Sequence, residues 1–114
     1  MKSNLRSEFD LIKKIRASAK RVPPSLLRCI GDDCAVFDPS FAESLAVSSD
    51  LLIEDVHFRR DWINSYFLGR KSLLVNLSDL AAMGTRPYAC LLSLGLPGSL
   101  VGEYFESFIT GFLE

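Results

Sequence analysis

The chain has 114 residues, which is enough for one small domain with its own hydrophobic core. Hydrophobic residues make up 48% of it and charged residues 24%, a composition that excludes a disordered chain. The formal net charge is only −1, and polar residues interrupt every apolar run well before a membrane-spanning length, so we expect no membrane partner.

The first expected element is a helix that begins after Ser7. Ser7 and Asp10 have the spacing of a capping box, with Ser7 as the N-cap residue. Apolar residues then recur at helical spacing as far as Ala19, and we expect the helix to end before Pro23. Its basic residues predict a solvated face. They lack the interleaved aromatic residues of a nucleic-acid surface, so we expect no nucleic-acid partner.

Basic and acidic residues are separated along the chain. Residues 1–28 hold eight of the thirteen basic residues and only two acids. Residues 29–58 hold no lysine or arginine and seven acids, namely Asp32, Asp33, Asp38, Glu43, Asp50, Glu54 and Asp55. These acids either form a solvated face or bind a divalent cation. Asp33 and Asp50 stand among apolar residues, where an unpaired carboxylate is costly to bury, and Mg²⁺ prefers carboxylate oxygens.

Three stretches have the composition of strands. Residues 29–37 predict a turn that enters a short strand, and residues 44–53 predict a second strand. Residues 88–97 form a continuous apolar run, as expected for a strand covered on both faces. With the expected helices, the order is α-β-β-α-β-α. This order predicts an α+β fold in which helices pack on one face of a mixed β-sheet.

Asn64 predicts the N-cap of a long helix through Met83, with Gly84 as the left-handed residue after it. Small or polar residues share one narrow sector of this helix: Ser65, Gly69, Ser72, Asn76 and Asp79. Either a ligand or another backbone lies along this stripe, or the stripe is a hydrogen-bond ladder between packed elements. Asp79 stands near the helix C-terminus, where the macrodipole disfavours an anion and a bound cation would remove the penalty.

Ser99 predicts the cap of a last helix. The residues expected to face inward in this helix are Tyr104, Phe105, Phe108, Ile109, Phe112 and Leu113. The helix reaches Glu114 with no Gly, Asn or Pro stop signal. We therefore expect residues 1–114 to be an amino-terminal domain truncated before its last strand, with a carboxy-terminal domain absent.

The cysteines Cys29, Cys34 and Cys90 are odd in number and form no CxxC pair. The first ten residues lack the apolar stretch of a signal peptide. Both features predict reduced thiols in a cytoplasmic protein.

Four stretches together resemble one enzyme family. The segments "GDDCAVF", "SSDLLIEDVHF" and "NLSDLAAMG" are similar to those of thiamine-monophosphate kinases, which belong to the superfamily of aminoimidazole ribonucleotide synthase. "EFDLIKKI" also resembles the opening helix of that family. The resemblance extends from Glu8 to Leu113, and "NLSDLAAMG" with "GDD" upstream is its most specific part.

The resemblance implies ATP- and Mg²⁺-dependent phosphorylation of thiamine phosphate to thiamine diphosphate, by a homodimer whose strands complete a β-barrel across the twofold axis. By position, the implied metal ligands are Asp33, Ser48, Ser49, Asp50 and Asp79, with Asp32 as a weaker candidate. His57 would contact thiamine phosphate. No catalytic residue is implied beyond the metal ligands, since phosphoryl transfer depends mostly on positioning and charge neutralisation.

The sequence departs from the family in three respects. Ser49 replaces a threonine, which keeps the oxygen, and Asp55 replaces a glycine in the loop before His57. The family's downstream "GGDT" strand and its glycine-rich second domain lie outside this chain, which is about a third of the usual enzyme. Two alternatives stay open: a related ATP-using enzyme, such as a selenophosphate synthetase or hydrogenase maturation protein, and a non-catalytic dimerisation module.

Overall fold

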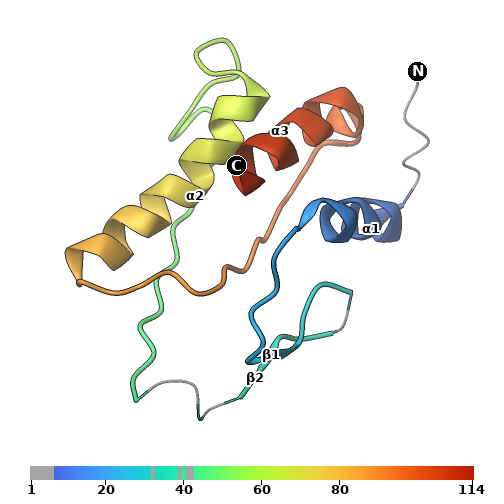
Figure 1. Cartoon of the computed structure of the whole chain (residues 1–114). Helices are drawn as coiled ribbons and strands as arrows, with labels where there is room; N and C mark the ends of the chain where they lie inside the picture. The colour runs from blue at the N-terminus through green and yellow to red at the C-terminus, as the bar shows by residue number, and fades with distance from the viewer. Residues whose placement is uncertain (1–6, 32, 39, 41–42) are drawn as a thin grey trace.

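Three helices and a small sheet make up the fold of the residues that the structure describes. The computed structural model describes residues 7–31, 33–38, 40 and 43–114. Its elements are α1 (Glu8–Ser18), β1 (Leu26–Arg28), β2 (Val36–Phe37), α2 (Ser65–Ala82), the 3₁₀ turn η2 (Gly98–Leu100) and α3 (Glu103–Leu113). Helix α3 contacts both α2 and α1, and β1 and β2 lie at the end of α1 away from the amino terminus (Figure 1). Among the residues described, no helix combines the length and apolar character needed to cross a bilayer.

The core is built from one face of α3 packed on α2. Its buried side chains are Leu68, Phe105, Phe108, Ile109 and Phe112. Phe105 is the most deeply buried, at 1% exposure, and the rings of Phe108 and Phe112 stack with their centroids 6.4 Å apart. Partly buried residues from α1, the 52–63 loop and the 92–96 segment surround this cluster. The expectation of an apolar inner face on the last helix is thus confirmed, except that Leu113 is 40% exposed.

Two glycines allow the backbones of α2 and α3 to approach each other. A Cβ at Gly69 would overlap the carbonyl oxygen of Phe108 and come within 2.8 Å of the Phe112 nitrogen. Reciprocally, a Cβ at Gly111 would overlap the carbonyl oxygen of Tyr66. Each glycine therefore faces the backbone of the other helix. Gly69 belongs to the narrow polar stripe of α2, so another backbone does lie along the first half of that stripe.

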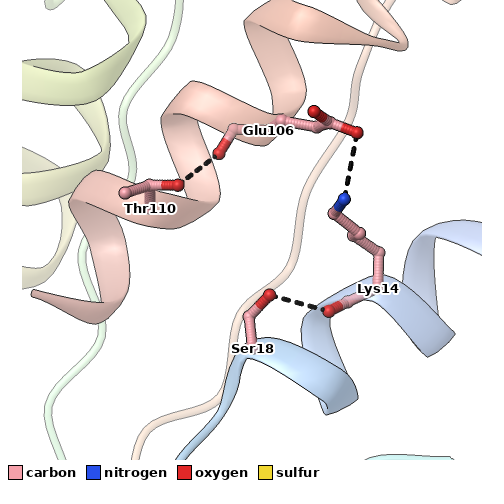
Figure 2. A network of polar contacts seen from close by, with 4 residues as sticks. All are labelled: Lys14, Ser18, Glu106 and Thr110. Carbon is pink, nitrogen blue, oxygen red and sulfur yellow. Dashed lines mark hydrogen bonds and ion pairs between the residues drawn. The ribbon is translucent and has the colours of Figure 1, made fainter. Parts of the chain in front are cut away.

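Helix α1 begins and ends as the sequence predicts. The Ser7 hydroxyl accepts a hydrogen bond from the Asp10 amide at 3.3 Å, and the Ser7 amide donates to the Asp10 carboxylate at 3.1 Å, which completes the capping box. Lys14 of α1 forms an ion pair with Glu106 of α3 at 3.1 Å, and Ser18 and Thr110 donate to carbonyls of their own helices (Figure 2). The paired side chains are 43% and 40% exposed, so the ion pair orients α1 and contributes about 1 kcal/mol or less.

The limits of α2 also confirm the sequence prediction. The Asn64 side chain accepts a hydrogen bond from the Phe67 amide at 3.0 Å, as an N-cap residue does. Gly84 has a φ of +66°, the left-handed conformation expected just after the helix. The predicted cap of the last helix is wrong, because Ser99 lies within η2 and the N-cap residue of α3 is Gly102.

The predicted sheet needs correction. Within the described residues, 44–53 and 88–97 form no strand, and the sheet is an antiparallel pair, β1 with β2, rather than a mixed sheet. The turn between β1 and β2 returns the chain onto itself, whereas the two apolar segments meet no partner for a ladder. Tyr88 reaches the sheet through its side chain, by a hydrogen bond to Ser25 and a ring contact with Phe37. Strands need paired backbones, which an apolar composition does not supply.

Substituting alanine for Gly69 or Gly111 should cost at least about 3 kcal/mol of unfolding free energy, because the added Cβ would meet backbone atoms that cannot move without separating α2 from α3. Urea unfolding followed by circular dichroism measures this. Gly98→Ala is the matched control, since a Cβ there meets nothing within 4 Å. Equal stability of the Gly69→Ala and Gly98→Ala variants would contradict the close approach of the helices.

Candidate functional site

The structure brings two of the family-like motifs together. The hydroxyl of Ser48, in "SSD", donates a hydrogen bond to a carboxylate oxygen of Asp79, in "NLSDLAAMG", at 3.1 Å. The two residues are 31 positions apart, so this contact depends on the tertiary fold. Asp79 is exposed, in the last turns of α2. A hydroxyl and a carboxylate side by side form an oxygen-only donor set, which suits a hard cation such as Mg²⁺.

The other predicted metal ligands are accessible to solvent. Asp33, Ser49 and Asp50 are exposed, so the cost of burying Asp33 and Asp50, which the sequence suggested, does not arise in this chain. Asp50 accepts a hydrogen bond from the amide of Leu51 at 2.8 Å. The weaker candidate, Asp32, lies outside the described residues. Among the residues that are described, no three Asp, Glu, His or Cys side chains gather as a metal site, and the complete ligand set stays a prediction.

The polar stripe of α2 divides into two parts. Ser65 and Gly69 are buried. Ser72 donates to the Gly69 carbonyl at 2.7 Å and Asn76 donates to the Ser72 carbonyl at 3.0 Å, so both side chains bond to their own helix. These bonds do not form a ladder between elements. Beyond them, Asp79 is bonded to Ser48 and stands open to solvent, where a ligand has access.

His57 is held by a compact loop between residues 53 and 58. The Ile53 carbonyl accepts from the amides of Val56 at 3.2 Å and His57 at 2.9 Å, and the Asp55 amide donates to the Phe58 carbonyl at 2.8 Å. The Ile53 amide donates to Nδ1 of His57 at 3.1 Å. Since Nδ1 accepts, the proton of the neutral ring lies on Nε2. The loop thus fixes both the position and the tautomer of an exposed imidazole.

Asp55 has the conformation of the glycine that the family usually carries at this position. Its φ is +63°, in the left-handed region that favours glycine and that Asp tolerates better than most residues. The backbone of the loop is therefore the one a glycine would allow. The Asp55 carboxylate lies 3.9 Å from Arg59 and is 78% exposed, so that ion pair adds little.

Charged residues in and just after this loop are paired with one another. Arg60 donates a hydrogen bond to Glu54, and this bond raises the pKa of the Arg60 guanidinium. Burial raises the pKa of the Tyr104 hydroxyl, with the nearby Arg60 opposing that effect. Tyr104 belongs to the first turn of α3, so the loop lies close to the start of that helix.

Two basic residues near the site were missed by sequence reasoning. Arg16 is exposed on α1, as expected, and its guanidinium also lies against Gly31, where a Cβ would come within 3.1 Å of Nη1. Gly31 has a φ of +105° in the turn that leads to Asp33. Lys71 of α2 donates to the His57 carbonyl at 3.5 Å. Charge complementarity between the basic helix and the acidic turn could have indicated Arg16, whereas no sequence pattern indicated Lys71.

Residues 31–114 match the family of AIR synthase related proteins, N-terminal domain, and the chain belongs to that family. The chain is also similar to proteins named thiamine-monophosphate kinase. It is 44% identical over 103 residues to the one from Escherichia coli K12, with 89% of this chain and 30% of that protein covered. It is 39% identical over 108 residues to the one from Buchnera aphidicola subsp. Schizaphis graminum, with 95% of this chain and 33% of that protein covered.

The protein of that name from Mycobacterium tuberculosis H37Rv is 32% identical over 107 residues, with 94% of this chain and 32% of that protein covered. The chain therefore spans about a third of the length of the curated relatives it matches. No solved structure matches it. These relatives bear the family name that the sequence motifs suggested, so the resemblance is confirmed.

Replacing Asp55 tests the conformation of the His57 loop. Asp55→Gly should be about 1–2 kcal/mol more stable than Asp55→Val, because a β-branched residue is strained at positive φ and glycine is not. Thermal unfolding of both variants measures the difference. The same pair of changes at Asp61, an exposed acid outside the left-handed region, is the control and should not favour glycine. A valine variant as stable as the glycine variant at position 55 would refute the left-handed conformation.

Proposed function

We propose that the gene product containing this chain transfers the γ-phosphoryl group of ATP to thiamine phosphate, forming thiamine diphosphate in a Mg²⁺-dependent reaction. The observation that carries the proposal is the hydrogen bond between Ser48 and Asp79. It joins two motifs of a family whose curated relatives are named thiamine-monophosphate kinase. Because the chain spans a third of those relatives, residues beyond it would supply the rest of the site.

In this proposal the chain contributes oxygen ligands and a substrate contact. Asp33, Ser48, Ser49, Asp50 and Asp79 would hold Mg²⁺, with Asp32 as a further candidate. Bound Mg²⁺ would neutralise the charge that two polyphosphates bring together. The donors fit that ion, since all are hydroxyl, carboxylate or backbone oxygens and Mg²⁺ keeps several water ligands. Exposed carboxylates at Asp33, Asp50 and Asp79 leave the ligands accessible to incoming metal and nucleotide.

The proposal includes a homodimer in the cytoplasm. Large apolar side chains remain exposed along the two segments that were expected as strands, including Leu45 at 60%, Val47 at 83% and Leu91 at 85%. A second copy that pairs with these segments would cover them and could form the barrel expected from the resemblance. The same exposed surface would serve the alternative function, a non-catalytic dimerisation module, so the kinase assay is what separates the two functions.

Asp79→Asn in the complete gene product should abolish formation of thiamine diphosphate while the melting temperature stays close to that of the wild type. The change keeps the shape of the side chain and removes the charge proposed to hold Mg²⁺. An assay with ATP, thiamine phosphate and limiting Mg²⁺ measures it. Ser78→Ala, an exposed neighbour on α2, is the control. If Asp79→Asn retains most of the activity, Asp79 is a surface residue bonded to Ser48 and no ligand.

Mg²⁺ should raise the melting temperature of this chain more than NaCl of equal ionic strength. A cation that binds only the folded state adds about 1.4 kcal/mol at ten times its dissociation constant. Asp50→Asn should weaken this response. Glu43→Gln removes an exposed acid from the same acidic segment and should leave the response intact. A response to Mg²⁺ that Asp50→Asn leaves unchanged would exclude Asp50 as a ligand.

A further inference from the structure

An ion pair encloses the loop that carries His57. The Arg60 guanidinium donates a hydrogen bond from Nε to a carboxylate oxygen of Glu54. His57 lies midway between these two residues in the sequence, so the pair closes a ring of chain around it. The backbone closes the same loop by the bridge between Glu54 and Phe58 and by the hydrogen bond from the Asp55 amide to the Phe58 carbonyl. The side-chain closure and the backbone closure therefore both involve Glu54.

This ion pair lies where the loop meets the start of α3. Burial raises the pKa of the Tyr104 hydroxyl, while Arg60 opposes that effect and Glu54 adds to it. Both charged groups are therefore near Tyr104, in the first turn of α3. Phe58, on the inner side of the loop, is partly buried and packs against the core cluster. The loop is thus restrained by an apolar contact with the core and by a polar closure beside α3.

The neighbouring arginine forms no comparable closure. Arg59 lies 3.9 Å from Asp55 and 3.5 Å from Asp61, and its guanidinium lies 5.2 Å from the centre of the Trp62 ring. The two acids are 78% and 67% exposed, whereas Glu54 is 34% exposed. A cation shared between two exposed acids at these distances restrains neither of them. Arg59 therefore offers a matched control for Arg60.

The ion pair is adjacent to the group that orients the imidazole. The Ile53 amide donates to Nδ1 of His57 at 3.1 Å, and Glu54 is the next residue in the chain. A movement of Glu54 would turn the backbone at Ile53, and with it the amide that Nδ1 accepts from. The hydrogen bond at one ring nitrogen decides which nitrogen of a neutral histidine carries the proton. The closure by Glu54 and Arg60 is thus connected to the tautomer of His57.

We propose that Glu54 and Arg60 are positioning residues whose ion pair keeps the His57 proton on Nε2 and so favours binding of the acceptor substrate, thiamine phosphate, an inference that rests on the proposed function. Neither residue contacts substrate in this assignment, because both act through the Ile53 amide. The Arg60 and Glu54 side chains are 49% and 34% exposed, and exposed ion pairs contribute little to stability. Loss of the pair should therefore change the ring while the protein stays folded.

The first experiment measures the tautomer by ¹⁵N NMR of the complete gene product, at a pH where the His57 ring is neutral. Signals of His57 are those lost in His57→Gln. Arg60→Ala and Glu54→Ala should each raise the fraction protonated on Nδ1 about threefold, since an exposed ion pair shifts an equilibrium only a few-fold. Their melting temperatures should stay near that of the wild type. Arg59→Ala should leave the tautomer unchanged. An unchanged tautomer in both Arg60→Ala and Glu54→Ala, or an equal change in Arg59→Ala, would overturn the proposal.

Exchanging the two charges tests whether the pair itself is responsible. Glu54→Arg alone places two guanidinium groups against each other and should disturb the tautomer at least as much as Arg60→Ala. Combining Glu54→Arg with Arg60→Glu restores an ion pair and should return most of the Nε2–H form. A folded double variant whose tautomer is no closer to the wild type than that of Glu54→Arg would contradict a positioning role.

Kinetics of the same variants separate this inference from the proposed function. KM for thiamine phosphate should rise as the Nε2–H fraction falls, while KM for ATP stays unchanged; an equal rise in both would overturn the assignment. A gene product that makes no thiamine diphosphate, but whose tautomer depends on Glu54 and Arg60, would refute the kinase assignment and support the positioning of the ring. An active gene product whose tautomer is independent of the pair would refute this inference alone.

Discussion

The fold depends on the close approach of α2 and α3 at Gly69 and Gly111. Each glycine faces a carbonyl of the opposite helix, so the two backbones come closer than side chains would permit. This approach sets how deeply Phe105, Phe108 and Phe112 enter the interface, because α3 carries all three rings. The buried apolar side chains of the core cluster, Leu68, Phe105, Phe108, Ile109 and Phe112, all belong to α2 or α3. Of the other elements, α1 and η2 contact α3, whereas β1 and β2 pair with each other.

The candidate site residues are connected to this helix pair in two ways. Lys71 and Asp79 both belong to α2. The Lys71 ammonium also donates a hydrogen bond to the His57 carbonyl, which joins α2 to the His57 loop. The segment with Ser48 is held to α2 by a hydrogen bond between exposed or half-exposed groups, which is a weaker attachment. Binding residues are held more precisely on helices and strands than on loops. Hydrogen bonds that are long in a ligand-free site often shorten when the ligand binds.

Charge is distributed differently in the acidic segment and in the region around His57. The acids proposed as metal ligands stand in a segment without lysine or arginine. The acids beside His57, in contrast, each face an arginine of their own loop. Carboxylates that must bind a cation would compete with arginine if they were paired with it. The exposed apolar residues of the expected strands form a third surface.

Local features of the fold could be predicted from the sequence because they depend on residues a few positions apart. The capping box of Ser7 and Asp10, the Asn64 cap and the left-handed Gly84 each involve one turn of backbone. Motif similarity likewise indicated the family and the candidate residues. The sheet could not be predicted this way, because a ladder requires two segments to meet, and neither the 44–53 nor the 88–97 segment meets one in this chain.

The tertiary structure decided which distant residues act together. Gly69 was assigned to a stripe of small residues, but only its position against Phe108 explains why the residue has no side chain. No sequence pattern distinguished Arg16 or Lys71, and folding placed Arg16 beside Gly31 and the Lys71 ammonium beside the His57 carbonyl. The sequence by itself determined the limits of α1 and α2 and the family, through short-range hydrogen bonds and motifs. The pairing of Ser48 with Asp79 and of Lys71 with His57 was decided by packing, because no local interaction links residues so far apart along the chain.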